Sequence, residues 1–300
     1  MSMNINALVC GNGPSLKNID YKRLPKQFDV FRCNQFYFED RYFVGKDVKY
    51  VFFNPFVFFE QYYTSKKLIQ NEEYNIENIV CSTINLEYID GFQFVDNFEL
   101  YFSDAFLGHE IIKKLKDFFA YIKYNEIYNR QRITSGVYMC ATAVALGYKS
   151  IYISGIDFYQ DTNNLYAFDN NKKNLLNKCT GFKNQKFKFI NHSMACDLQA
   201  LDYLMKRYDV NIYSLNSDEY FKLAPDIGSD FVLSKKPKKY INDILIPDKY
   251  AQERYYGKKS RLKENLHYKL IKDLIRLPSD IKHYLKENIK PLYKSKSFDT

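Results

Sequence analysis

The stretch from Arg132 to Asp157, RITSGVYMCATAVALGYKSIYISGID, constrains the fold most strongly, because it predicts one helix that leads directly into one strand. Thr134 and Ser135 are residue types that cap helix N-termini, and Gly147 is typical of a helix C-cap. We therefore expect a helix from about Ser135 to Gly147. A short run rich in isoleucine follows and predicts a strand that ends just before Asp157.

A helix N-terminus beside a strand C-terminus is where α/β proteins bind anions and nucleotides. The alternative is an ordinary capped helix of the core. The rest of the chain favours the binding site, because short apolar runs repeatedly end in a small polar residue. These runs cover residues 6–10, 29–33, 48–53, 79–81, 151–156 and 210–214, and the polar residues that follow five of them are Asn12, Asn34, Asn54, Ser82 and Asp157.

The carboxyl ends of parallel strands lie along one edge of a sheet, where open α/β folds bind their ligands. The pattern therefore predicts an α/β fold with a Rossmann-like, mostly parallel sheet flanked by helices, and a nucleotide-type pocket at that edge. Apolar residues at helical spacing predict further helices over residues 58–70, about 107–128 and 193–208.

The periodicity ends after Asp157, where residues 158–192 are rich in Asn and Lys, and we expect this segment to form a flexible lid over the site. The predicted domain organisation has an α/β domain, which binds a nucleotide-sugar, over residues 1–157 and 193–257. The lid spans residues 158–192, and a basic amphipathic helical tail spans residues 258–300.

Two kinds of bound cofactor are disfavoured by the motifs. The sequence GNGPSL at residues 11–16 lacks the third glycine of the dinucleotide fingerprint, which excludes an NAD site. The six cysteines form no CxxC pair, and the chain contains no D-x-D, the usual carboxylate clamp for a metal-bound nucleotide-sugar. We expect no metal and no cofactor.

The formal net charge of +9 is concentrated in the tail, where residues 261–296 carry ten Lys or Arg against four acidic residues. Apolar residues at helical spacing predict one helix from about Leu262 that ends at Pro278, and a second short helix from Ser279. These helices either pack on the core or a neighbouring subunit, or bind an anionic membrane surface. No signal peptide and no run of roughly 20 apolar residues is present, so we expect a cytoplasmic protein.

Among the four histidines, His192 lies between the expected lid and a helix start, beside the predicted pocket. An unperturbed pKa near 6.5 suits a general base, although a lone histidine is often a cap or surface residue. Tyr159 and Tyr166 on the lid could donate hydrogen bonds to a departing phosphate, although many tyrosines in such a chain only pack. The basic tail and the aromatic residues also suit a rival class, nucleic-acid-binding proteins.

Longer motifs now point to one family. They are GNGPSL (11–16), DVFRCNQFYFED (29–40), FFEQYY (58–63), NEIY with QRITSGVYMC (125–140), GIDFYQ (155–160), YAFD (166–169) and KLIKDLIRLPSDIKHY (269–284). In this order they resemble the lipooligosaccharide sialyltransferases of Campylobacter, glycosyltransferase family 42. The likeness covers most of the chain.

The resemblance implies metal-independent, inverting transfer of sialic acid from CMP-sialic acid to a terminal galactose (alpha-2,3), or to another sialic acid (alpha-2,8), of a lipooligosaccharide. It also implies a homo-oligomer, a tetramer. Because the tail is basic and amphipathic and the acceptor is lipid-linked, we expect peripheral binding to the cytoplasmic face of the bacterial inner membrane, and we expect no nucleic-acid partner. The residues that the motifs and the resemblance together predict to bind the donor are Gly11, Asn12, Gly13, Asn34, Gln35, Asn54, Gln61, Thr134, Ser135, Gly155 and Asp157.

By the same resemblance, Arg132 lies near the reacting centre, Tyr159 and Tyr166 hold the departing phosphate, and His192 takes the proton from the acceptor hydroxyl. The chain departs from some relatives at Phe189, where they carry a lid tyrosine, and in a slightly longer lid. A CMP-sialic acid hydrolase stays open as an alternative, because the same base would activate water.

Overall fold

The structure is a computed structural model that describes residues 6–86, 92–158, 166–168, 192–216, 220–236 and 266–294. The chain divides into two compact units, Met1–Asp248 and Lys249–Thr300, which are described separately.

The first unit is built on an eight-stranded sheet in the order β6-β5-β4-β2-β1-β7-β8-β9, in which every neighbouring pair is parallel. The strands are β1 (Asn6–Cys10), β2 (Asp29–Cys33), β4 (Asp47–Phe53), β5 (Asn75–Cys81), β6 (Ala105–Leu107), β7 (Ser150–Ser154), β8 (Asn211–Ser214) and β9 (Lys222–Leu223). The predicted Rossmann-like parallel sheet is confirmed. Strands β3 (Arg41–Tyr42) and β10 (Ser234–Lys235), absent from the prediction, form a separate antiparallel pair.

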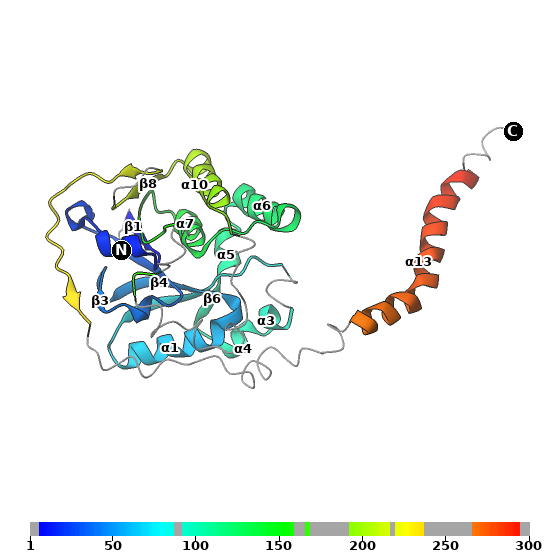
Figure 1. The fold of residues 1–300 in the computed structure, drawn as a ribbon, viewed down its shortest axis with the longest axis horizontal. Coiled ribbons are helices and arrows are strands. Elements are labelled where there is room, and N and C mark those ends of the chain that lie inside the picture. The colour runs from blue at the N-terminus through cyan, green and yellow to red at the C-terminus, as the bar shows by residue number, and fades with distance from the viewer. Residues whose placement is uncertain are drawn as a thin grey trace. The chain divides into compact units, whose positions relative to one another are not determined.

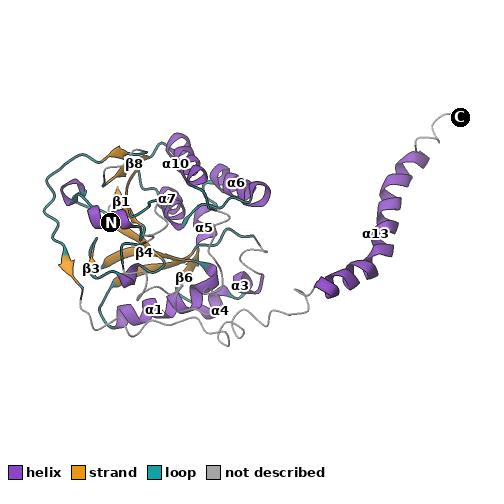
Figure 2. Cartoon of the chain, in the orientation of Figure 1, coloured by secondary structure: helices purple, strands orange, loops and turns teal. Residues whose placement is uncertain are grey.

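Helices cover both faces of this sheet (Figures 1 and 2). Figure 1 shows α1 and α4 on one side, and α7 and α10 on the other. The α-helices among the described residues of this unit are α1 (Phe58–Gln70), α3 (Phe92–Asp96), α4 (Phe98–Tyr101), α5 (Gly108–Ile112), α6 (Lys116–Tyr124), α7 (Ser135–Ala145) and α10 (Met194–Tyr208). Short 3-10 helices span Pro14–Asn18, Tyr21–Arg23, Phe36–Phe38 and Pro55–Val57, and a π-helix spans Asn125–Asn129.

The main core lies between the sheet and the layer of α7 and α10. It combines inward-facing residues of the central strands with one face of each helix; among them are Val9, Phe31, Phe52, Ile151, Val137, Cys140, Ala141, Ala200, Leu201 and Leu204. The four residues Ala7–Cys10 of β1 are buried in succession, because helices cover both faces of the central strand. Burial on both faces explains why the predicted strands read as continuous apolar runs.

The order of the strands places a reversal point at the centre of the sheet. From β1 the chain adds β2, β4, β5 and β6 on one side, then returns through α7 to add β7, β8 and β9 on the other. Helix α7 packs against β1 and β2. Open α/β sheets leave a crevice at such a point, outside the carboxyl ends of the strands.

The helix expected over residues 107–128 is wrong. The chain instead forms β6, α5, α6 and the π-helix Asn125–Asn129, which Arg130 ends in a left-handed conformation, with φ of 52°. The turn between α5 and α6 buries Leu115 alongside Ile112 and Phe118 in the core, a packing gain that overrides the local helical pattern.

The prediction of two helices separated at Pro278 is also wrong, because the described part of the second unit, residues 266–294, forms one helix, α13 (Leu266–Lys294), which continues through Pro278. Proline removes one hydrogen-bond donor and bends a helix rather than always ending it. Figure 1 shows α13 bent along its length.

Candidate active site

The polar residues predicted to share one edge of the sheet do so. Asn12 follows β1, Asn34 follows β2, and Asn54 follows β4, while Ser82 and Asp157 follow β5 and β7. Since all of these strands are parallel, the residues lie along the carboxyl edge, on both sides of the reversal point between β1 and β7. The structure therefore places the candidate site at this edge, where the reversal of strand order predicts a crevice.

Three glycines bring the loops after β1 and β7 into direct contact at the reversal point. The N–H of Gly11 donates to the Ser154 carbonyl at 2.9 Å, and that of Gly13 donates to the Gly155 carbonyl at 2.9 Å. A Cβ at Gly11 or Gly13 would collide with the opposite loop, and Gly155 has a φ of +67°. The glycines thus let two loops pack against each other at the floor of the crevice.

Asp157 fastens these two loops through Ser15, a residue that sequence reasoning did not single out. The N–H of Ser15 donates to Asp157 Oδ2 at 2.9 Å, and its hydroxyl donates to Oδ1. The N–H of Gly155 donates to Ser15 Oγ at 3.0 Å. Both carboxylate oxygens of Asp157 therefore hold the GNGPSL turn, and 142 residues separate it from Ser15, which no local pattern could reveal.

Asn12 and Asn34 link the strand ends to the α7 start. Asn12 Nδ2 donates to the Cys33 carbonyl at 2.9 Å, and Asn34 Nδ2 donates to Ser135 Oγ at 3.1 Å. Asn34 has a left-handed φ of 50°, which asparagine tolerates better than most residues. Among the described residues, the buried Oδ1 of Asn12 has no hydrogen-bond partner.

The remaining predicted binding residues on this side lie near α1. Asn54 Oδ1 accepts a hydrogen bond from the N–H of Phe56 at 3.0 Å and so caps the 3-10 helix that follows. Gln61 in α1 and Gln35 after β2 are buried. The Oε1 of Gln61 lacks a hydrogen-bond partner within the part of the chain that the structure describes.

One piece of the expected lid, residues 166–168, lies against the crevice. The N–H of Ala167 donates to the Asn12 carbonyl at 2.7 Å, and the ring of Phe168 packs on Phe38 with centroids 5.7 Å apart. Tyr166 stacks on Phe168, and burial raises the pKa of its hydroxyl to about 12. Tyr166 is therefore a neutral hydrogen-bond donor at physiological pH. Tyr159, Phe189 and most of the expected lid lie outside the described residues.

His192 lies directly before α10, and its ring is oriented by the segment that leads into α7. Its Nδ1 lies 2.8 Å from the Arg132 carbonyl oxygen. Because a carbonyl oxygen only accepts, Nδ1 carries the proton and Nε2 carries the lone pair of the neutral ring. Burial lowers the pKa of His192 below its ordinary value of 6.5, and the nearby Arg132 charge adds to this, so the neutral ring prevails at pH 7. The Nε of Arg132 lies 3.9 Å from Glu126 Oε2.

Asp197 in α10 is a second residue that sequence reasoning missed. It accepts hydrogen bonds from the N–H of Thr134 at 2.9 Å and from the Thr134 hydroxyl at 2.7 Å. Burial raises the pKa of Asp197 to about 6, against the lowering effect of these two bonds. The only signal in the sequence was that an acidic residue stands five positions after His192. That signal does not reveal the partner, Thr134, which lies 63 residues away.

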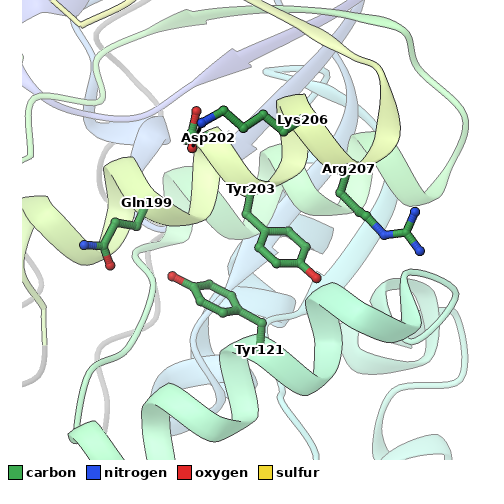
Figure 3. A pocket seen from close by; sticks show the side chains of 6 residues that line it. All are labelled: Tyr121, Gln199, Asp202, Tyr203, Lys206 and Arg207. Carbon is green, nitrogen blue, oxygen red and sulfur yellow. Dashed lines mark ion pairs between the residues drawn. The ribbon is translucent and has the colours of Figure 1, made fainter.

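A surface hollow of about 520 Å³ lies elsewhere, between α6 and α10, and its lining residues are Tyr121, Gln199, Asp202, Tyr203, Lys206 and Arg207. Figure 3 shows the two tyrosine rings facing each other between the helices, where they stack with centroids 5.0 Å apart. None of the predicted site residues lines this hollow, so the crevice at the sheet edge remains the candidate site.

Comparisons with known proteins identify the family to which the chain is similar. A sequence model of the family described as Alpha-2,3-sialyltransferase (CST-I) matches residues 5–288. The sialyltransferase CstII from Campylobacter jejuni, solved with the substrate analogue CMP-3FNeuAc, is 52% identical with a TM-score of 0.78; the match covers 84% of this chain and 98% of that one.

Two further structures are similar. Monofunctional alpha-2,3-sialyltransferase Cst-I from Campylobacter jejuni is 46% identical with a TM-score of 0.77, over 94% of this chain and 97% of that one. A CST-II structure with a trisaccharide acceptor and CMP is 51% identical with a TM-score of 0.75, over 84% of this chain and 99% of that one.

Proposed function

The chain belongs to the alpha-2,3-sialyltransferase (CST-I) family, and on that premise we propose that it transfers sialic acid from CMP-sialic acid to a terminal galactose of a lipooligosaccharide. Transfer is a single inverting displacement that needs no metal ion. One observation carries the proposal. At the reversal point, the ends of β1, β2 and β7 lie beside the N-terminus of α7. Relatives of the same fold were solved with CMP or with a CMP-sialic acid analogue.

The donor binds along the sheet edge. Within the described part of the chain, the Oδ1 of Asn12 and the Oε1 of Gln61 have no hydrogen-bond partner, and both are acceptors that suit the amino and hydroxyl groups of a nucleotide-sugar. The N-terminus of α7, beside Asn34 and Ser135, suits the carboxylate of the sialic acid, because backbone N–H groups and the helix dipole favour an anion there.

Stabilising the leaving phosphate is the main electrostatic task of this reaction. The bond between C2 of sialic acid and the phosphate oxygen breaks while negative charge grows on CMP. Tyr166 is a neutral phenol donor on a segment that is hydrogen-bonded to Asn12, and it is suited to donate to that phosphate. We assign the same role to Tyr159 on the strength of the resemblance alone.

His192 is the general base. Its Nε2 lone pair takes the proton of the galactose 3-hydroxyl as the oxygen forms a bond to C2 of sialic acid. The Arg132 carbonyl fixes the tautomer that this step needs, since it holds the Nδ1 proton. The attack comes from the face opposite the phosphate, so the configuration at C2 inverts.

The test is an assay of purified protein with CMP-sialic acid, with and without lactose, in the presence of EDTA. We expect sialyl-lactose, identified by mass spectrometry, at the same rate with and without EDTA. Free sialic acid as the sole sugar product would instead favour the hydrolase. A requirement for added metal would contradict the metal-independent mechanism, and a disialylated product would show that sialic acid is also an acceptor.

The proposed acceptor is linked to a lipid, which implies that the enzyme acts at a membrane. The helix α13 supports binding to a membrane surface. Within the second unit α13 is the one element described, and one of its faces carries Leu270, Leu274, Leu277, Ile281 and Leu285 among lysines. No described helix is long and apolar enough to span a bilayer. We infer that this face binds the anionic cytoplasmic leaflet. Cosedimentation with vesicles containing phosphatidylglycerol should be lost when residues 262–300 are deleted; unchanged cosedimentation would contradict it.

We also propose that the protein is a homo-oligomer, as the resemblance implies. Tyr124 and Tyr128 stack on each other at the surface although both are more than half exposed, and Ile127 beside them is half exposed. Such exposed apolar groups favour contact with another copy. Light scattering should give a tetramer mass; a monomer at micromolar concentration would contradict the proposal.

A further inference from the structure

Thr134 occupies the N-cap position of α7 without capping the helix. Its backbone has the extended conformation of an N-cap residue, with φ of −75° and ψ of 168°, yet its side chain makes no capping hydrogen bond. Threonine at this position ordinarily accepts a hydrogen bond from the N–H two or three residues later. Something must therefore hold the hydroxyl away from the helix.

Asp197 holds the Thr134 hydroxyl in this position. One carboxylate oxygen accepts from the Thr134 N–H at 2.9 Å and the other accepts from the Thr134 hydroxyl at 2.7 Å. The carboxylate is 1% exposed, so water does not compete for these bonds. These two bonds fix the Thr134 side chain in an orientation in which its hydroxyl oxygen accepts no hydrogen bond from the N–H groups of α7. Thr134 therefore leaves the first turn of the helix uncapped.

The same contact also sets the distance between two parts of the site. Thr134 is joined to Asp197 on the first turn of α10, and Arg132 is joined to His192 just before α10. Two tethers therefore connect the segment before α7 to the head of α10. They fix the proposed base relative to the open helix N-terminus.

We propose that Asp197 is a positioning residue for the donor: it turns Thr134 away from α7, so that the uncapped N–H groups at residues 136 and 137 can bind an anionic group of the donor. This inference rests on the proposed function. The anion is either the carboxylate of the sialic acid or the phosphate of CMP, and both have the chemistry that a helix N-terminus recognises.

The test is a double-mutant cycle of Asp197→Ala and Thr134→Val, with binding measured by titration calorimetry. In Asp197→Ala the released hydroxyl caps α7 and competes with the ligand, so the Kd for CMP-3FNeuAc should rise roughly fivefold to tenfold, in line with the strength of a capping bond. In the Thr134→Val background no hydroxyl can cap, and the same Asp197→Ala change should alter the Kd by about twofold or less.

The two possible anions are separated by repeating the cycle with CMP, which lacks the sialic acid. An effect on both ligands assigns the phosphate, and an effect on CMP-3FNeuAc alone assigns the carboxylate. Equal losses in the two Thr134 backgrounds, or no loss in either, would overturn the inference, because Asp197 would then act only through general stability or not at all.

Asp197→Asn is the matched control, and it also serves if the alanine variant does not fold. The amide oxygen still accepts from the Thr134 N–H, and the amide nitrogen donates to the threonine oxygen, so the hydroxyl stays turned away. The Kd should stay within about threefold of wild type. A loss of tenfold or more would show that charge, not positioning, is what matters, and would overturn the inference. Failure of the unmodified protein to bind CMP-3FNeuAc would contradict the proposed function itself.

Discussion

Helices α7 and α10 both begin after a hydroxyl residue in an extended backbone conformation, but only α10 is closed by it. Ser193 accepts a hydrogen bond from the N–H of Cys196 at 3.2 Å, whereas the Thr134 hydroxyl accepts none from α7 and is held by Asp197, to which it donates. His192 lies just before the cap of the closed helix, α10. The N-terminus of the open helix, α7, lies beside Asn34 at the end of β2. The difference shows that a capping residue type predicts where a helix begins but not whether its first turn is available to a ligand.

The largest effect is expected at the head of the closed helix. His192→Ala should lower kcat by roughly 10²- to 10⁴-fold, because the acceptor hydroxyl loses its base. The Kd for CMP-3FNeuAc should change little, since the open helix is untouched. In the wild type, kcat/KM should stay high at pH 6.5, where an ordinary histidine is half protonated, and should fall only at lower pH, because burial lowers the pKa of His192. Full transfer activity in His192→Ala would contradict the assignment.

The second prediction concerns the carboxylate that keeps α7 open. Asp197 has a pKa raised to about 6, whereas an unfolded Asp titrates near 3.9. Between these values the folded protein binds a proton that the unfolded chain has lost, so stability should fall by about 2 kcal/mol as pH rises from 4 to 6.

Urea unfolding across that pH range measures the effect. Asp197→Asn should remove this contribution to the dependence of unfolding free energy on pH. His192, whose pKa is lowered, contributes in the opposite direction, but it does so in both proteins and therefore cancels when the variant is compared with the wild type. The neighbouring thiols of Cys140 and Cys196 have pKa values raised by burial and do not titrate there. Identical slopes in the two proteins would show that Asp197 is not the titrating group.

A third change alters the open helix from the sheet side. Asn34→Gly keeps the left-handed backbone but removes the hydrogen bond from Nδ2 to Ser135 Oγ. The Kd for CMP-3FNeuAc should rise about fivefold to tenfold, as expected for one lost hydrogen bond and a less ordered helix start. Equal affinity would remove Asn34 from the donor site. Asn71→Gly, at the C-cap of α1, is a control for the added glycine.

The smallest effect is expected from removing the cap that closes α10. Ser193→Ala should cost about 1 kcal/mol in the free energy of unfolding, the usual value of an N-cap, and Ser193→Gly only a few tenths. Chemical denaturation measures both. If Ser193→Ala instead weakened donor binding as much as Asp197→Ala, the contrast between a closed and an open helix would be wrong.

Local patterns predicted much of the fold because they reflect burial directly. The run Phe58–Gln70 became α1 with those bounds, and the strands next to β1 lie where the apolar runs placed them, since a strand covered on both faces must be apolar throughout. The pattern failed over residues 107–128, where Leu115 turns into the core and breaks the helix. At Pro278 the error was the opposite one: a helix end was predicted where α13 continues, because a helix can bend at proline without ending.

The sequence predicted which residues lie at the same edge of the sheet, because that follows from the positions of the strands, but it did not predict the contacts of these residues. Strand order brings Asn12, Asn34 and Asp157 to one edge, so their grouping follows from reading the strands correctly. The partners that hold them do not follow. Ser15 meets Asp157 and Asp197 meets Thr134 across long sequence separations, and each pairing depends on how loops and helices pack.

The most direct test of the account is a crystal structure of this protein with CMP-3FNeuAc. We predict that an anionic oxygen of the ligand accepts a hydrogen bond from the N–H of Gly136 or Val137, while the Thr134 hydroxyl still donates to Asp197 and His192 faces C2 of the sugar. A ligand anion bound away from α7, with Thr134 turned onto the helix as its cap, would contradict the account.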